Sequence, residues 1–575
     1  MRSKSFAMRL KFLAAVLFIA LAACLVRLFY WQVISGRDLS SQARIQYESQ
    51  KLIGAPRGNI FASDGSWLAV GGDAWLIYAE LPKISEDPRR IADKLAPFFV
   101  EDAPDRVDLL VEIERLFSLL TKKEIVWIAL KHKVTPEVKA NIEALNLQGI
   151  GFEREESRSY PEASASAHLL GFVGKEEEGS DKGYFGLEGF YDLSLAGKTG
   201  FHSQESDAFG IPIIIGDTKE VSAVPGVDLL THIDKRVQLM LDQKLLEGIE
   251  KYGAKGGTAI IANPSDGSIL GMSSFPSYDP LNYTDFSDEF FKNPAISDTF
   301  EPGSVFKVLV MASALDAGVI NTDTVCDICS GPVHVDKYTI ETWDSKFHPD
   351  AKPQDIIVNS DNVGMVFVGQ KLGADKLYDY LDKFGIGHLT EVDLQGEVSP
   401  ALREKDSWSI VDLAVASFGQ GIAITPMQML KAVSTIANKG ISVRPQVVDK
   451  LTGVGWQEDI KPQIGERVIS EKSASLITAM MVEAAKKGES KWTHLKGFKV
   501  AGKTGTAQIP ISGHYDSDKT IASFVGFAPA DKAKFVMIIT LKEPTSSPWA
   551  SETAAPLWYS IAKDLFPYFG IQPEN

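Results

Sequence analysis

The sequence predicts a multidomain α+β protein with an N-terminal membrane helix, an elongated α/β middle domain and a C-terminal domain whose antiparallel sheet is flanked by helices. Three observations predict this fold class. The chain has 575 residues, too many for a single hydrophobic core. A basic N-terminus leads into a long apolar run, and the second half combines strand-like with helix-like periodicity. A composition of 45% hydrophobic and 23% charged residues is that of a globular chain.

The first 34 residues have the pattern of a membrane anchor. Residues 1–11 contain four basic residues and no acidic one, and residues 12–34 are mostly apolar or aromatic. A spanning helix needs about 20 such residues, and a basic flank favours the cytoplasmic side. We therefore expect a cytoplasmic tail at 1–11 and a transmembrane helix at 12–34. Arg27 would lie near the far interface, beside Tyr30 and Trp31.

A cleaved signal is the alternative. Residues 20–22 have the small-x-small form of a cleavage site, and residues 21–24 resemble a lipoprotein box that ends at Cys24. The apolar and aromatic residues that continue beyond Cys24 favour the anchor. Under either interpretation most of the chain lies outside the cytoplasm.

Charge and cysteine content narrow the partners and cofactors. The net charge of −16 argues against nucleic acid. Cys326 and Cys329 form a C-x-x-C pair, for which a disulfide is the first expectation in an oxidising compartment. Free thiols are the second interpretation, and a zinc site completed by His334 and His348 is the third. We expect no metal and no cofactor.

Residues 35–223 are expected to form a non-catalytic pedestal. They mix short alternating segments with charged helical ones, and they contain no recognisable group of nucleophile and base. Near Pro225 the pattern changes, so the C-terminal domain is expected at 224–575. There, residues 234–252 have helical spacing, and residues 258–262, 269–273 and 535–541 read as buried strands.

The first motif that carries chemistry is S-x-x-K at Ser304 to Lys307. The Glu-Pro-Gly at 301–303 interrupts regular structure, and residues 305–315 are apolar enough for a buried helix. Residues three apart share a helical face, so Lys307 is expected to reach the Ser304 hydroxyl. Burial lowers the pKa of an ammonium enough for the amine to act as a base. Alone, the motif is more often a helix cap followed by a solvated lysine.

Two further motifs follow in order. Ser360, Asp361 and Asn362 precede another apolar run, and they offer a hydroxyl for proton relay and an amide for a substrate carbonyl. Their alternative role is again a helix cap.

The third motif is K-T-G-T, at Lys503, Thr504, Gly505 and Thr506. It reads as a strand beside a cleft, where Gly505 does not block a substrate, Lys503 attracts a carboxylate and the threonines offer hydroxyls. Backbone N–H groups of Ser304 and Thr506 are expected to form an oxyanion hole. A second K-T-G begins at Lys198, and its flanks predict only a loop.

The three motifs in this order are typical of penicillin-binding proteins and serine β-lactamases. Over nearly its whole length the chain resembles a class B penicillin-binding protein, a membrane-anchored D,D-transpeptidase of peptidoglycan synthesis. The C-x-x-C pair and the residues at 59, 63–64 and 305–306 depart from the usual pattern. The resemblance also rests on residues 57–60, 186–188, 191, 195, 301–303, 418–422, 425–428, 501–502 and 524–529.

The resemblance implies a role for each motif residue. Ser304 would be the nucleophile towards the penultimate D-Ala of a stem peptide, and β-lactams would acylate it. The other roles would be Lys307 as base, Ser360 as proton relay, Asn362 as substrate ligand, and Lys503, Thr504 and Thr506 as carboxylate clamp.

Partners and rival functions follow from the same resemblance. Residues 306–308, 380–387 and 524–529 favour the septal type over the elongation type. The resemblance implies location in the bacterial cytoplasmic (inner) membrane, beside a polytopic lipid II polymerase and other wall-synthesis or division proteins. A D,D-carboxypeptidase or a β-lactamase would carry the same motifs, and a non-catalytic sensor or scaffold is a further alternative.

Overall fold

The computed structural model divides into two compact units. One comprises Met1–Pro56 and Gly197–Pro225, and the other comprises Arg57–Ala196 and Gly226–Asn575. The structure describes residues 2–39, 48–100, 106–123, 125–176, 180–205, 218–511 and 514–574.

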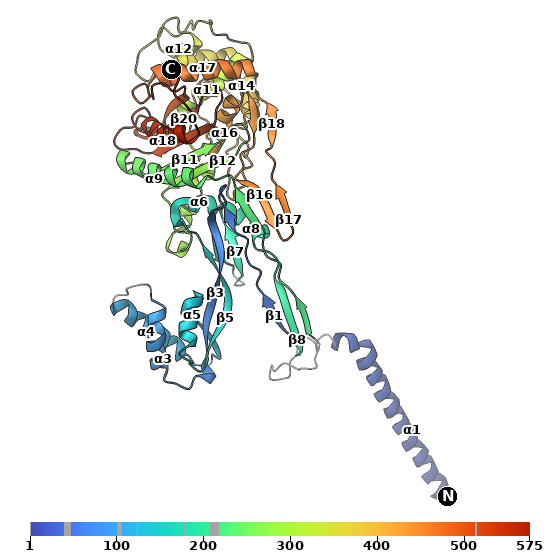
Figure 1. Ribbon diagram of the computed structural model, residues 1–575. Coiled ribbons are helices and arrows are strands. Elements are labelled where there is room, and N and C mark those ends of the chain that lie inside the picture. The colour runs from blue at the N-terminus through green and yellow to red at the C-terminus, as the bar shows by residue number, and fades with distance from the viewer. Residues whose placement is uncertain are drawn as a thin grey trace. The chain divides into compact units, whose positions relative to one another are not determined.

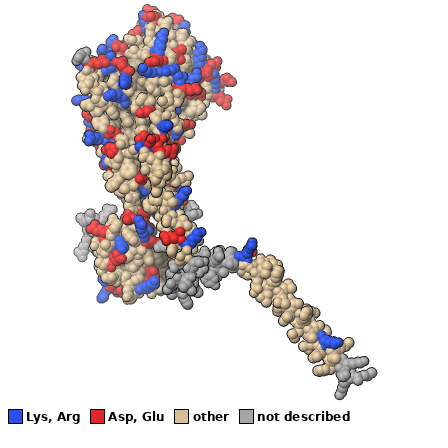
Figure 2. Space-filling view, turned by 45° about the vertical axis from the view of Figure 1, so that its right-hand side comes forward, with Lys and Arg blue, Asp and Glu red and all other residues tan. Residues whose placement is uncertain are grey.

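The smaller unit contains the apolar helix and a small sheet. Helix α1 (Arg2–Phe29) continues into the π-helical turn η1 (Tyr30–Ile34), and Phe6–Ile34 is long and apolar enough to cross a membrane. Figure 2 shows a surface of mostly uncharged side chains on this helix. The helix begins at Arg2 and therefore includes most of the expected cytoplasmic tail at 1–11. Its sheet has the antiparallel order β1 (Glu48–Ile53), β8 (Gly200–Glu205) and β9 (Thr218–Val221).

Two expectations about single residues are tested in this unit. The Arg27 guanidinium lies 5.7 Å from the ring centre of Trp31, which agrees with the predicted grouping at one end of the helix. The second K-T-G is not a plain loop, because Lys198 forms an isolated bridge with Val224 and Gly200 begins β8. It belongs to a different unit from Ser304.

The larger unit begins with a mixed sheet and the helices packed on it. Among the described residues the sheet order is β17-β16-β10-β2-β3-β4, with β5 also paired to β3. Residues from α3, α4 and β3 to β5 share a small core. The strands are β2 (Ile60–Phe61), β3 (Trp67–Glu80), β4 (Trp127–Val134), β5 (Ile150–Ser159), β10 (Asp228–Thr231), β16 (Val448–Gly453) and β17 (Trp456–Asp459), and the helices are α3 (Pro88–Leu95), α4 (Arg106–Leu120) and α5 (Pro136–Glu143).

This sheet crosses the expected domain boundary at 223/224. Strand β10 follows the boundary in sequence, yet it pairs in parallel with β2 and antiparallel with β16. Backbone hydrogen bonds therefore join the pedestal sequence to the C-terminal sequence. The segment between them contains the hairpin β6 (Phe172–Lys175) and β7 (Asp181–Tyr184) and the short helices α6 (Ala167–Leu170), α7 (Gly186–Phe190) and α8 (Asp192–Leu195).

A buried ion network holds the pedestal together. Glu188 of α7 is fully buried and accepts from Arg57 Nε at 2.7 Å and from Arg158 Nε at 2.6 Å. Arg57 also pairs with Asp192 of α8 at 2.8 Å. Because Arg57 precedes β2 and Arg158 lies on β5, one carboxylate connects three segments that are distant in sequence.

The C-terminal part has the predicted antiparallel sheet flanked by helices, with the order β12-β11-β21-β20-β19. Alternate residues of the strands face opposite cores. Ile260 and Ile538 pack in one core with the helices around α11, whereas Ala259 and Ile539 pack against α9 and α18 on the other face (Figure 1). The strands are β11 (Gly256–Ala262), β12 (Ile269–Phe275), β19 (Ala501–Ile511), β20 (His514–Ala528) and β21 (Phe535–Lys542).

The helices around this sheet confirm the predicted fold class. The expected helix at 234–252 is α9 (Lys235–Tyr252), which Asp234 caps through its carboxylate. The others are α10 (Pro294–Ser297), α11 (Lys307–Asp316), α12 (Pro353–Val358), α13 (Asn362–Leu372), α14 (Ala374–Lys383), α15 (Ile410–Ala416), α16 (Pro426–Ala437), α17 (Glu471–Lys487) and α18 (Ala554–Tyr568). Two small two-stranded sheets pair β13 (Val333–Val335) with β14 (Tyr338–Ile340) and β15 (Ile441–Val443) with β18 (Ile464–Arg467).

Candidate active site

Ser304 lies in a tight turn that leads into a buried helix. The turn is the 3₁₀ segment η7 (Gly303–Val305). The α-helix α11 begins only at Lys307, so Ser304 lies in the 3₁₀ turn that precedes the helix and not in the helix itself. Gly303 has φ +55°, which an L-residue rarely adopts, and its N–H donates to Gly419 O at 2.9 Å. Ser304 is half-buried, whereas Val305 is fully buried. The turn therefore presents the serine at the surface of a rigid core.

Lys307 is fully buried and makes three hydrogen bonds to the second motif. Its Nζ donates to Ser360 O at 2.6 Å, to Asn362 Oδ1 at 2.7 Å and to Ser360 Oγ at 3.3 Å. The Ser304 hydroxyl has no hydrogen-bond partner among the described residues, so the expected bond between Ser304 and Lys307 is not formed. Such bonds often tighten only when substrate binds.

Burial lowers the pKa of Lys307 to about 7, and the neighbouring ammonium of Lys503 also lowers it. The carboxylates of Glu489 and Asp361 act in the opposite direction. Burial likewise lowers the pKa of Lys503, and Glu489 again opposes the shift. A substantial fraction of Lys307 is therefore neutral at physiological pH, as a general base requires.

Ser360 connects the two lysines. Its hydroxyl accepts from Lys503 Nζ at 3.0 Å as well as from Lys307, and its side chain is almost completely buried. Its φ of +53° is unusual for a residue with a side chain. Because both Nζ atoms donate to this oxygen, Ser360 connects the proposed base to the K-T-G-T strand. The geometry fits a proton relay.

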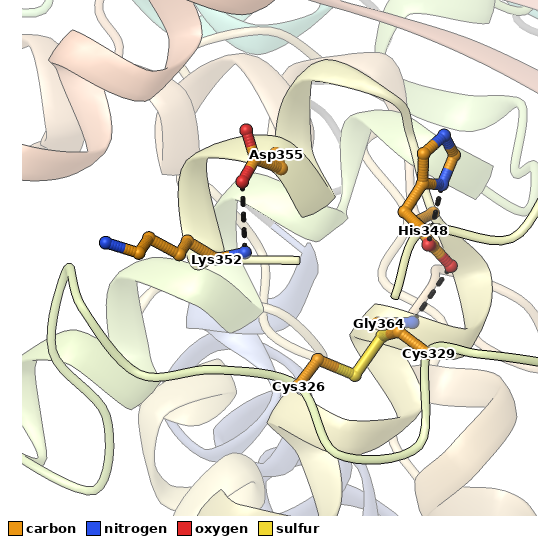
Figure 3. Close-up of a disulfide and its surroundings, with 7 residues drawn as sticks. Cys326, Cys329, His348, Lys352, Asp355 and Gly364 are labelled. Atoms are coloured by element: carbon orange, nitrogen blue, oxygen red, sulfur yellow. Dashed lines mark hydrogen bonds and ion pairs between the residues drawn. A yellow bond between two sulfur atoms is a disulfide. The ribbon is translucent and has the colours of Figure 1, made fainter. Parts of the chain in front are cut away.

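Asp361, the middle residue of the second motif, caps a helix and contacts His348, which is hydrogen-bonded to the disulfide-bonded Cys329. Asp361 Oδ1 accepts from Gly364 N at 2.9 Å at the start of α13, and its Oδ2 lies 3.2 Å from His348 Nδ1 (Figure 3). The backbone of His348 in turn donates to Cys329 O at 3.1 Å. Cys326 and Cys329 are joined by a disulfide, so neither sulfur is available as a zinc ligand.

The K-T-G-T motif lies on β19, the edge strand of the sheet. Lys503 Nζ also donates to Thr504 Oγ1 at 3.2 Å, and Thr506 Oγ1 accepts from Ala550 N at 3.0 Å. Gly505 also has a packing role. A Cβ there would lie 2.9 Å from Pro302 O and 2.9 Å from Val305 Cγ1. The missing side chain thus allows β19 to pack against the turn that holds Ser304.

Replacing Gly505 with alanine is expected to slow acylation of Ser304 on the order of 10- to 100-fold, because the added methyl group pushes the strand away from the turn. The second-order acylation rate constant measures the effect. Gly331→Ala is the matched control, because a Cβ at Gly331 meets nothing within 4 Å. Equal rates for the two variants would contradict this packing role.

A cavity of about 100 Å³ brings the motifs together. Ser304, Asn362 and Thr506, one residue from each motif, line it together with Gly303. Its walls also include residues that the sequence did not single out as site residues, namely Trp343, Phe418, Gln420, Glu489 and Trp549. The ring centres of Trp343 and Trp549 are 5.4 Å apart, although the two residues are about 200 positions apart in sequence. No local pattern marks either tryptophan or Glu489, so only the tertiary structure places them here.

The arrangement supports serine acyl transfer. It combines a half-buried hydroxyl, a buried amine with a lowered pKa, a shared relay hydroxyl and an edge strand. Asn362 lies at the cavity wall, and its Oδ1 accepts from the buried Lys307.

Comparison with known proteins agrees with this geometry. Residues 257–565 match the penicillin binding protein transpeptidase domain, and residues 52–231 match the penicillin-binding protein dimerisation domain. The chain is 30% identical to Stage V sporulation protein D of Bacillus subtilis over 100% of this chain and 88% of that protein. It is 28% identical to the peptidoglycan D,D-transpeptidase FtsI of Escherichia coli over 98% of this chain and 92% of that protein.

A solved structure supports the same assignment. A peptidoglycan synthetase from Bifidobacterium adolescentis superimposes with a TM-score of 0.72 at 26% identity, covering 92% of this chain and 98% of that chain. The transpeptidase match alone spans more than half of the 575 residues, and the site motifs lie inside it. The chain therefore belongs to the class B penicillin-binding proteins, the family that joins a dimerisation domain to a transpeptidase domain.

Proposed function

We propose that the protein is a peptidoglycan D,D-transpeptidase that acts through an acyl-enzyme on Ser304. The observation that carries the proposal is the pair of buried lysines that share the Ser360 hydroxyl beside the cavity that Ser304 lines. The name of the E. coli relative supports the reaction class.

In the first half-reaction, neutral Lys307 accepts the Ser304 proton, directly or through Ser360. Ser304 Oγ then forms a bond to the carbonyl carbon of the penultimate D-Ala. Backbone N–H groups of Ser304 and Thr506 stabilise the resulting oxyanion. When the tetrahedral intermediate collapses, the peptide bond breaks, and the terminal D-Ala leaves with the proton on its amine.

In the second half-reaction, an amine of a neighbouring stem peptide attacks the ester carbonyl. The base takes a proton from this amine, the ester bond breaks as a new peptide bond forms, and the base passes the proton to Ser304 Oγ. Asn362 orients the acyl chain, while Lys503, Thr504 and Thr506 bind the terminal carboxylate in the first step. This carboxylate clamp is also the group that recognises the carboxylate of a penicillin.

The direct test is labelling with a fluorescent penicillin, followed by mapping of the modified peptide. We expect the label on Ser304 and its complete loss in Ser304→Ala, because the hydroxyl forms the covalent bond. Ser475→Ala is the matched control, since Ser475 is exposed on α17. A label on any other residue, or labelling of Ser304→Ala, would contradict the proposal.

Hydrolysis is the second candidate function, and Glu489 is the observation that favours it. A β-lactamase or D,D-carboxypeptidase needs a base that activates water, and the Glu489 carboxylate lines the same cavity as Ser304. The lifetime of the penicilloyl enzyme separates the two functions. We expect it to persist for hours, whereas release within seconds would identify a hydrolase.

The site of action is proposed from the anchor and the family. The helix Phe6–Ile34 holds the protein in the cytoplasmic membrane, with the catalytic part outside the cytoplasm. The proposed role is septal wall synthesis, with a polytopic lipid II polymerase as partner of the helix and pedestal. Depletion is expected to give filaments; round or swollen cells would indicate an elongation role instead.

A further inference from the structure

Glu489 is a carboxylate in the active-site cavity that none of the three motifs contains. It lies two residues beyond the end of α17, and its Oε2 accepts from Thr504 Oγ1 at 2.7 Å. Among the described residues that line the cavity with Ser304, Glu489 is the one acidic side chain. A hydrogen bond therefore links this loop directly to the K-T-G-T strand.

The position is unfavourable for an anion unless a cation balances it. The C-terminus of a helix carries partial negative charge, so a carboxylate just beyond α17 is repelled. The balancing cations are Lys503 and Lys307, both of which interact electrostatically with Glu489. The positive charge of the lysine pair thus stabilises the Glu489 carboxylate at this position.

A continuous polar chain connects Glu489 to the base. Lys307 Nζ and Lys503 Nζ both donate to Ser360 Oγ, Lys503 Nζ donates to Thr504 Oγ1, and Thr504 Oγ1 donates its only proton to Glu489. Glu489 is therefore the anionic end of a chain that contains two ammonium groups.

Two other charged groups, Asp361 and Lys503, act on Lys307. Asp361, at the start of α13, accepts from Gly364 N and contacts His348, whose backbone N–H donates to Cys329 O. Lys503 on β19 is a cation and opposes protonation of Lys307. Glu489 is thus the anion that faces the lysine pair from the cavity side.

We propose that Glu489 is a positioning residue for acylation, which directs the Thr504 hydroxyl and sets the charge state of the pair Lys307 and Lys503. This inference deepens the proposed function and rests on it. Loss of the negative charge makes neutral Lys307 available at lower pH, because an ammonium without its counter-ion releases its proton more readily.

The test is the pH profile of penicillin acylation in the full-length protein, for the wild type, Glu489→Gln and Glu489→Asp. In Glu489→Gln, the midpoint of the acidic limb is expected to move down by about one pH unit. In Glu489→Asp, which keeps the charge, the midpoint is expected to stay at the wild-type pH although the plateau rate falls. Glu471→Gln, an exposed change at the start of α17, is the matched control with an unchanged profile.

Each midpoint is read relative to the plateau of the same variant, so partial misfolding lowers the amplitude without moving the midpoint. A Glu489→Gln midpoint at the wild-type pH would overturn the inference and leave a packing role. A penicilloyl adduct that the wild type releases quickly and Glu489→Gln retains would also overturn it, because Glu489 would then activate water. If wild-type Ser304 is not labelled at all, the proposed function itself fails.

Discussion

Replacing Lys307 with methionine is expected to slow acylation of Ser304 by penicillin on the order of 10²- to 10⁴-fold, the usual contribution of a positioned general base. Methionine fills a similar volume in this fully buried position but cannot accept a proton. The second-order acylation rate constant measures the loss. The melting temperature is expected to stay close to that of the wild type, because the change removes a buried amine rather than packing volume.

The wild-type pH profile provides a further check on the same residue. The pKa of Lys307 is lowered to about 7, so the amine is protonated and inactive as a base below that pH. The acylation rate is expected to fall about tenfold per pH unit well below pH 7 and to reach a plateau above about pH 8. Lys371→Met, at an exposed position near the end of α13, is the matched control. Normal acylation by Lys307→Met would exclude the lysine as the base.

Replacing Glu188 with glutamine is expected to lower the free energy of unfolding by about 3–5 kcal/mol, the cost of removing one partner from a buried ion pair. The amide preserves the shape but removes the carboxylate that Arg158 pairs with and leaves Arg57 with Asp192 alone. Thermal unfolding of the full chain measures the change, and an apparent melting temperature lower by several degrees is expected.

Glu458→Gln is the matched control for this experiment, because Glu458 lies exposed on β17 of the same sheet. It is expected to leave the melting temperature within a degree of the wild type. Penicillin acylation by the folded fraction of Glu188→Gln is expected to be normal, because the network lies outside the cavity. Equal melting temperatures for the two variants would show that the network contributes little.

Much of the fold was predictable because its signals are local. The apolar run at the N-terminus indicates its helix, and the short, almost continuously apolar runs at 258–262 and 535–541 indicate the buried sheet. The pedestal sheet was not predictable in the same way. Strands β10 and β16 pair with each other across more than 200 residues of sequence, and no local pattern contains information about such a partner.

The sequence by itself determined the residue types proposed for the chemistry: a serine as nucleophile, two lysines, a second serine as proton relay and a threonine-bearing strand. These residues are recognisable because the three motifs occur together in a fixed order, whereas each short motif alone would also fit a helix cap or a turn. The tertiary structure alone decided how they are connected. Lys307 is hydrogen-bonded to Ser360 and Asn362 rather than to Ser304. The absence of a side chain at Gly505 allows β19 to pack against the turn at 303–305. Glu489 and two tryptophans from distant parts of the sequence line the cavity. The physical reason is that hydrogen bonds and charges act over a few ångströms in space, whatever the separation of the residues in sequence.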